Sequence, residues 1–279
     1  MLHDLAHDEP FSWWGPVWSP AVPRGLGDLL HDRVLTLETA ALLWTLMSRR
    51  ASLAVIAGPR GAGKSTLLRA LLDFYPPDHR RIYVRGRYDP LTMLDHPAVD
   101  PRRTLLLVNE ISHHFPFYLW GDGVARLLDT RDNDFTFATT AHAADAADLA
   151  RSLSAAPLRL GADTIRAIDL VVTLDVWSER GAIRRTVRQV SGWCPPSSAD
   201  LVPVSLSITD PTTGQSRYDV PSIASLMDRL GDRLSDATID SELRQRTTAI
   251  AEMSRGSRAL AAEALTGSGQ KWVDRPHIR

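Results

Sequence analysis

A short glycine-rich stretch limits the folds open to this chain more than any other feature. It reads Gly58-Pro59-Arg60-Gly61-Ala62-Gly63-Lys64-Ser65, follows the apolar run Leu53–Ala57 and leads into a helical pattern from Lys64 to Phe74. The spacing Gly-x-x-x-x-Gly-Lys-Ser between a strand and a helix predicts a phosphate-binding loop. The glycines let backbone N–H groups point at an anion, and the helix N-terminus adds partial positive charge. A chance glycine-rich turn is the alternative, and the strand and helix around the loop disfavour it.

The loop predicts how the chain would hold ATP and Mg²⁺. Lys64 should contact the β- and γ-phosphates, and the Ser65 hydroxyl should be the protein ligand of Mg²⁺. The residues predicted to bind the nucleotide are Gly58, Pro59, Arg60, Gly61, Ala62, Gly63, Lys64, Ser65 and Thr66. The sequence therefore predicts a P-loop protein with ATP and Mg²⁺ as its cofactors.

A second apolar strand ends in an acidic residue. The run Thr104-Leu105-Leu106-Leu107-Val108 is followed by Asn109-Glu110. Phosphoryl transfer needs a carboxylate near the metal and the attacking water, and Glu110 is the candidate to hold or orient that water. This pattern is like a Walker B strand, with Asn109 where many P-loop enzymes have Asp. The alternative is that Glu110 is simply an exposed carboxylate at a strand end.

Strand and helix patterns alternate through the middle of the chain. Strands are predicted at Leu53–Ala57, Arg81–Val84, 104–108 and 135–139, and helices at 35–49 (with Thr36 as N-cap), 64–74, around Leu127-Leu128 and at 143–153. Continuous apolar strands alternating with helices indicate a parallel sheet covered on both faces. The predicted fold class is therefore α/β: a P-loop NTPase of RecA-like type, with a mostly parallel sheet, helices on both faces and a C-terminal helical region.

Three regions are predicted from composition. Residues 1–34 form an irregular arm rich in Pro, Trp and Gly, whose tryptophans either pack on the domain's own surface or dock a partner. Residues 35–194 form the P-loop ATPase core, which ends in a β-hairpin from Leu170 to Trp177 and from Ala182 to Val190. The stretch Pro195-Pro196-Ser197-Ser198 predicts a boundary, and residues 195–279 are predicted to be mainly helical.

Charge and cysteine content restrict the partners and the compartment. The chain of 279 residues has 32 Lys plus Arg and 33 Asp plus Glu, a net charge of −1, so direct nucleic-acid binding is not expected. Cys194 is the sole cysteine, which rules out an internal disulfide and favours a reducing compartment. No apolar run approaches the roughly 18 residues of a membrane span. We expect a cytoplasmic protein, with a peripheral position at the inner face of a membrane as a second option.

A third motif follows the acidic strand. Ala138-Thr139-Thr140-Ala141-His142-Ala143 has a strand ending in Thr-x-His, followed by a helix of small residues. With the phosphate loop and Asn109-Glu110, it resembles the ATPase domain of type II secretion, type IV pilus and type IV secretion motors, whose members typically have Gly-Glu in the second motif and a His box in the third. The resemblance covers roughly residues 35 to 192. It implies that His142 senses the γ-phosphate, so the predicted catalytic residues are Lys64, Glu110 and His142.

The resemblance also implies an assembly. Its members work as rings, so we expect a homo-oligomer, a hexamer, whose ATP hydrolysis powers a membrane-embedded secretion or pilus assembly complex. The nucleotide would lie at a subunit boundary, where an arginine acts across it. The candidates for that arginine are Arg85, Arg87, Arg102, Arg103 and Arg131.

Two departures from the family pattern favour an alternative function. In Tyr88-Asp89-Pro90, Tyr stands where the family's acidic box has a functional Glu, and Ser112-His113 replaces an Arg-Asp pair. Hydrolysis could then be slow, and the alternative is a low-turnover ATP-dependent switch or regulatory P-loop protein. Asn109 and Tyr88 favour the switch, whereas Glu110 and His142 favour the motor. A small-molecule kinase would need an arginine-bearing lid, and the sequence has no clear one.

Overall fold

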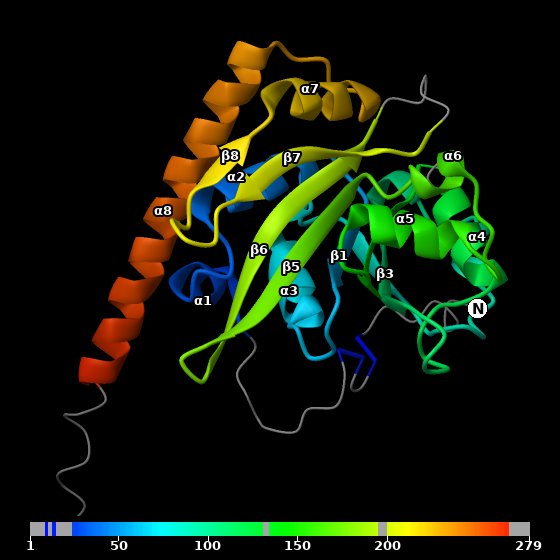
Figure 1. Ribbon diagram of the computed structural model, residues 1–279, viewed down its shortest axis with the longest axis horizontal. Helices are drawn as coiled ribbons and strands as arrows, with labels where there is room; N and C mark the ends of the chain where they lie inside the picture. The colour runs from blue at the N-terminus through cyan, green and yellow to red at the C-terminus, as the bar shows by residue number, and fades with distance from the viewer. Residues whose placement is uncertain (1–8, 11–12, 15–23, 131–133, 195–199, 268–279) are drawn as a thin grey trace, which may run out of the picture.

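The computed structural model describes residues 9–10, 13–14, 24–130, 134–194 and 200–267, with side chains up to Arg255. In this part of the chain, eight strands form one sheet in the order β2-β3-β4-β1-β5-β6-β7-β8 (Figure 1). The strands are β1 (Leu53–Ala57), β2 (Arg80–Val84), β3 (Thr104–Ile111), β4 (Thr136–His142), β5 (Leu170–Glu179), β6 (Ala182–Trp193), β7 (Pro203–Thr209) and β8 (Ser216–Tyr218).

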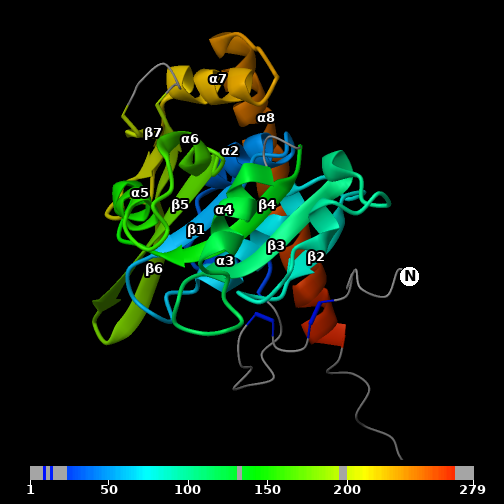
Figure 2. The ribbon, with the colours of Figure 1, turned by 90° about the vertical axis from the view of Figure 1, so that its right-hand side faces the viewer.

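The first five strands of that order run parallel, and the last three continue the sheet antiparallel. β1 lies between β4 and β5, with Leu53 opposite both Ala138 and Leu170. β4 therefore separates the strand that leads into the phosphate loop from the strand that carries Glu110 (Figure 2). This strand order confirms the predicted RecA-like α/β fold with a mostly parallel sheet.

Helices cover both faces of the sheet, because the central strands are apolar on both sides. The helices are α1 (Leu26–His31), α2 (Leu37–Met47), α3 (Lys64–Leu71), α4 (Asp122–Asp129), α5 (Ala146–Ser154), α6 (Ala162–Ile165), α7 (Val220–Arg229) and α8 (Asp236–Gly267), with 3-10 turns at Leu72–Phe74, Thr92–Leu94 and Pro101–Arg103. Alternate residues of β1 face opposite sides. Val55 packs in a core with α1, α2, α3, α7 and α8, whereas Ile56 packs in a second core with α4, α5 and α6.

The predicted helix near residue 35 and the predicted hairpin are both confirmed. Thr36 caps α2, since its side chain accepts a hydrogen bond from the Thr39 N–H. β5 and β6 pair as an antiparallel hairpin, and its turn contains Arg180 and Gly181. Figure 1 shows the tip of this hairpin extending past the strands beside it.

The region after residue 194 contains strands as well as the predicted helices. β7 pairs with β6, and β8 pairs with β7, so the sheet continues beyond the predicted division at 194/195. The stretch 195–198, which the sequence predicts as a boundary, lies outside the described residues. The division into three regions stays a prediction, and the helix α1 lies inside the region predicted as an irregular arm.

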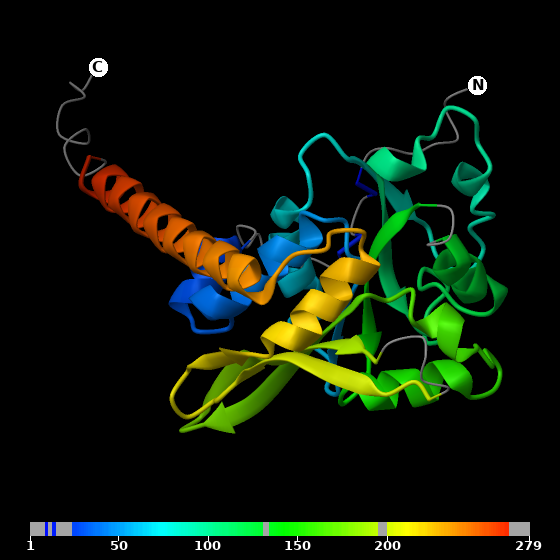
Figure 3. The same ribbon diagram turned by 90° about the horizontal axis from the view of Figure 1, so that it is seen from above.

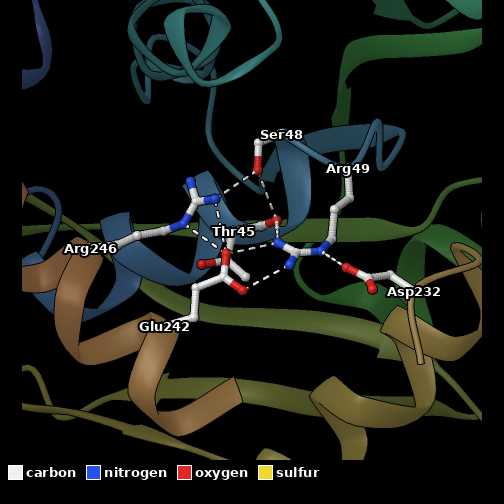
Figure 4. Close-up of polar contacts among 6 residues, drawn as sticks. All are labelled: Thr45, Ser48, Arg49, Asp232, Glu242 and Arg246. Atoms are coloured by element: carbon white, nitrogen blue, oxygen red, sulfur yellow. Dashed lines mark hydrogen bonds and ion pairs between the residues drawn. The ribbon is translucent and has the colours of Figure 1, made fainter. Parts of the chain in front are cut away.

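The long helix α8 is fixed to α2 through a charge network around Glu242 (Figure 4). Arg49 donates to both Glu242 carboxylate oxygens, at 2.9 and 2.8 Å. Arg246 donates to the same carboxylate at 3.0 Å, and its guanidinium lies over the Trp44 ring at 4.5 Å. This network holds the start of α8, and the helix then continues past the body of the domain (Figure 3).

Among the described residues, no helix has the length and apolar character needed to span a membrane.

Candidate functional site

The phosphate loop begins where β1 ends and closes where α3 begins. Gly61 has φ +69° and Gly63 has φ +101°, conformations that favour glycine because it lacks a Cβ. Gly63 is also the N-cap of α3, so Lys64 and Ser65 lie in the first turn of the helix. The unpaired N–H groups of that turn and the loop's own N–H groups make this position suited to an anion.

Lys64 lies among the other two predicted catalytic residues. Its side chain is 7% exposed, and its Nζ is 3.4 Å from Glu110 Oε2 and 3.2 Å from His142 Nε2. Burial lowers the pKa of Lys64 below its ordinary value, and the Glu110 carboxylate opposes that shift only in part. A cation held where water solvates it poorly gains by contact with a multiply charged anion.

Glu110 occupies the penultimate position of β3 and is buried, so it is not the exposed strand-end carboxylate of the alternative interpretation. The pairing of β3 with β4 shifts register between Val108 and Ile111, and such irregularities re-aim side chains. Thr140 Oγ1 lies 3.5 Å from Oε2 of Glu110. Oε1 is buried and receives no hydrogen bond from the described residues, although His142 Nε2 lies 3.6 Å away. An unsatisfied buried carboxylate oxygen is costly unless a ligand or water completes it.

His142 is the last residue of β4 and links the loop to the acidic strand. Its Nδ1 lies 3.2 Å from the Gly58 carbonyl oxygen, and its Nε2 faces both Lys64 and Glu110. β1, β3 and β4 are neighbouring parallel strands, so their carboxyl ends meet at one edge of the sheet, where ligands bind in α/β folds. The three predicted catalytic residues are therefore brought together, while their roles stay a prediction.

Asn109 faces away from this cluster. Its side-chain amide donates to the Trp13 carbonyl, on the opposite side of β3 from Glu110. Trp13 in turn donates from Nε1 to the Val84 carbonyl at 3.4 Å and packs edge-on against Tyr83 at 5.0 Å. The position that holds Asp in many P-loop enzymes thus anchors the N-terminal segment here.

Two tryptophans of the N-terminal arm, Trp13 and Trp14, pack on the chain itself. Trp13 is buried, and Trp14 packs against it and lies near the Arg69 guanidinium of α3 at 5.7 Å. This agrees with the first of the two interpretations of the N-terminal arm for these two residues. Trp18 and most of residues 1–23 lie outside the described residues.

The predicted trans-acting arginines have different surroundings. Arg87 donates to the His113 carbonyl at 2.7 Å, Arg102 is paired with Asp134 and Arg103 with Asp78, each at 2.9 Å. Arg85 is exposed, and Arg131 lies outside the described residues. No neighbouring subunit is present, so the arginine that acts across a boundary stays a prediction.

Sequence reasoning missed Arg185, which contacts the phosphate loop from β6. Its Nε donates to the Ala62 carbonyl at 2.8 Å, and its Nη2 donates to the Gly61 carbonyl at 3.5 Å. A concentration of arginines at 184, 185 and 188 on the last strand of the predicted core was the available signal. Nothing in that pattern alone identifies which arginine meets the loop.

Three comparisons with known proteins complete the description of the site. A family model described as ABC transporter matches residues 45–165, which contain the phosphate loop, Glu110 and His142. A comparison with curated proteins found no match.

Among solved structures, the chain is similar to the VirB11 ATPase of the Brucella suis type IV secretion system, solved with sulphate. The two are 18% identical over 65% of this chain and 68% of the other, with a TM-score of 0.42. It is also similar to the Legionella pneumophila ATPase DotB, with 14% identity, 85% of this chain and 59% of the other covered, and a TM-score of 0.40. These similarities are distant, so the geometry of the site carries the functional argument.

Proposed function

We propose that the chain binds ATP–Mg²⁺ at the phosphate loop and hydrolyses it, as a motor-type ATPase resembling those that power type II or type IV secretion or pilus assembly. The observation that carries the proposal is the meeting of Lys64, Glu110 and His142 beside the loop, within 3.6 Å of one another. A phosphate cradle alone supports binding, whereas a carboxylate and a histidine aimed at the same point support hydrolysis.

Each residue has a distinct role in this proposal. The loop from Gly58 to Thr66 supplies backbone donors, Lys64 neutralises phosphate charge, and the Ser65 hydroxyl holds the metal. Bound Mg²⁺ would neutralise charge on the phosphates during transfer. Glu110 would orient the attacking water through its buried Oε1, and His142, beside the Gly58 carbonyl, would contact the γ-phosphate.

The contact between Lys64 and Glu110 makes the availability of the Glu110 carboxylate depend on whether a nucleotide is bound. In the structure, Lys64 Nζ lies 3.4 Å from Glu110 Oε2. When Lys64 turns to phosphate oxygens, it would release the Glu110 carboxylate, which is then free to hold the attacking water.

The assembly and its setting belong to the same proposal. The chain would act as a homo-oligomeric ring, a hexamer, in the cytoplasm, peripheral to a membrane-embedded secretion or pilus assembly complex. The support is the resemblance carried by the three motifs. An arginine from the neighbouring subunit would complete the site.

A low-turnover switch is the second candidate, and Asn109 favours it. Asn109 carries an amide and not a carboxylate, and that amide donates to the Trp13 carbonyl, so this position supplies no carboxylate to a metal. Regulated binding of ATP without rapid hydrolysis would then be the function of the site.

ATP turnover measured beside oligomeric state distinguishes the two. The motor proposal predicts Mg²⁺-dependent phosphate release and, by light scattering with ATP–Mg²⁺, a shift from small species to a ring of about six times 30.8 kDa. A strict monomer that binds ATP without turnover would favour the switch. A strict monomer that hydrolyses ATP would overturn the motor and keep the ATPase.

A further inference from the structure

Arg185 meets the phosphate loop on the side away from Glu110, and the known motifs give it no role. We propose that Arg185 is a positioning residue: its guanidinium holds the loop's carbonyls outward so that the following N–H groups face the nucleotide phosphates. The inference rests on the proposed function only in taking the loop as a phosphate site. It does not require hydrolysis.

The contact is formed by two donors of one guanidinium. Nε donates to the Ala62 carbonyl at 2.8 Å, and Nη2 reaches the Gly61 carbonyl at 3.5 Å. The stem of the side chain lies along Gly63, since a Cβ built there would be 3.5 Å from Cδ and Nε of Arg185. Arg185 thus hydrogen-bonds two consecutive residues of the loop, Gly61 and Ala62, and its stem lies beside the third, Gly63.

The geometry of the peptide bond gives this contact a consequence for anion binding. In a planar trans peptide, the C=O of one residue and the N–H of the next point in opposite directions. When the carbonyls of Gly61 and Ala62 are held towards Arg185, the N–H groups of Ala62 and Gly63 are turned away from it. Those N–H groups are among the donors that a phosphate loop offers, so Arg185 orients them before any ligand arrives.

Arg185 also differs from the neighbouring arginines of β6 in that no carboxylate of the described residues pairs with its charge. Arg184 pairs with Glu179 at 3.1 Å, and Arg188 pairs with Asp175 at 3.0 Å. Within the described part of the chain, Arg185 has no carboxylate partner, and its cation faces the loop. Its charge therefore adds to that of Lys64 in attracting an anion.

The arrangement needs arginine rather than a generic cation. A guanidinium is planar and presents several N–H donors in a fixed fork, so one side chain can hold two carbonyls at once. A lysine ammonium is a point charge on a flexible stem. Arg185→Lys therefore keeps the charge and loses the paired contact, and Arg185→Ala loses both.

Titration with ATP and with pyrophosphate tests the inference, and Arg184→Ala is the matched control on the adjacent position. Pyrophosphate probes the loop without the nucleoside. We expect Arg185→Ala to lower the affinity for both ligands by about tenfold and Arg185→Lys to lower it by less. Arg184→Ala should bind both ligands as the unmodified chain does. In steady state, the loss should appear in KM, with kcat changed by less than about threefold.

Hydrogen exchange provides a readout that simple packing would not move. With saturating pyrophosphate, which protects the amides that donate to it, Arg185→Ala should exchange faster than the unmodified chain in the peptide that contains Ala62 and Gly63, while the core strands β1 and β3 keep their protection. If Arg185→Ala unfolds, Arg185→Lys carries the test, because it keeps the charge and most of the stem.

The outcomes separate this inference from the proposed function. Unchanged ligand affinity in both Arg185 variants would overturn the inference and leave the ATPase proposal intact. Absent turnover, with pyrophosphate binding that depends on Arg185, would support the inference and contradict the ATPase. An unmodified chain that binds neither ligand would overturn both.

Discussion

The two sides of the phosphate loop differ in how they are built. On one side, Glu110 and His142 come from β3 and β4, parallel strands of the α/β alternation that follows the loop, and the carboxyl ends of both strands lie at the same edge of the sheet. On the other side, Arg185 comes from an antiparallel strand 123 residues beyond Ala62. In the proposed function the first side supplies the groups that act on a bound phosphate, and in our further inference the second side holds the loop itself. The chemistry and the shape of this site would then come from separate parts of the fold.

Lys64→Ala should have the largest effect, because the Lys64 side chain lies between the phosphate loop and Glu110. The substitution removes that charge, so ATP affinity should fall by at least about a hundredfold. A fall of this size corresponds to the loss of a charge-assisted contact of roughly 3 kcal/mol. Titration with a fluorescent ATP analogue measures it, and competition with unlabelled ATP is the control. Undiminished affinity would place the nucleotide elsewhere.

Glu110→Gln should reduce ATP turnover without reducing ATP binding. The amide has nearly the shape of the carboxylate but cannot accept a proton from water, so ATP should still bind while turnover falls by more than about tenfold, roughly 1.4 kcal/mol of barrier. Phosphate release at saturating ATP measures the change. A smaller loss would mean that another group activates the water.

Asn109→Asp tests the other face of the same strand. The change removes the donor to the Trp13 carbonyl and places a carboxylate against that oxygen, so the free energy of unfolding should fall by about 1 to 2 kcal/mol. Denaturant unfolding measures the loss, and faster proteolysis at the N-terminus should accompany it. Asn109→Ala is the uncharged control. A rise in ATP turnover in Asn109→Asp would instead show that position 109 reaches the metal site.

Glu242→Gln should have the smallest effect, far from the loop. Burial by itself would raise the pKa of Glu242, but its contacts with Arg49 and Arg246 outweigh burial and hold the pKa below its ordinary value of 4.5. Because the pKa is lower in the folded chain than in the unfolded one, the stabilisation is present above about pH 4.5 and is lost as the pH falls below it. The substitution should cost about 1 kcal/mol at pH 7 and less at pH 3.

Unfolding curves at the two pH values measure this difference between Glu242→Gln and the unmodified chain. ATP turnover at pH 7 should not change. An equal loss of stability at both pH values would mean that the carboxylate charge contributes nothing to the anchoring of α8.

Local patterns predicted the loop and the strands that bring Lys64, Glu110 and His142 together, and the limit of such patterns is visible in particular residues. The loop, β1, β3 and β4 follow from apolar runs and glycine spacing, which report on neighbours in sequence. The contact of Asn109 with Trp13 joins residues 96 positions apart, and nothing local signals it. β7 and β8 lie in a region predicted as mainly helical. The prediction missed them because their place in the sheet is set by pairing, of β7 with β6 and of β8 with β7, and not by their own short sequences.

A single-turnover measurement asks whether Glu110, on one side of the loop, acts on bound ATP while Arg185, on the other side, holds the loop. With protein in excess and ATP fully bound, the rate of phosphate formation is followed in the unmodified chain, Glu110→Gln and Arg185→Ala. The account predicts a rate at least about tenfold lower in Glu110→Gln and a rate within about threefold of the unmodified chain in Arg185→Ala. Equal rates in the unmodified chain and Glu110→Gln, or a collapse confined to Arg185→Ala, would contradict it.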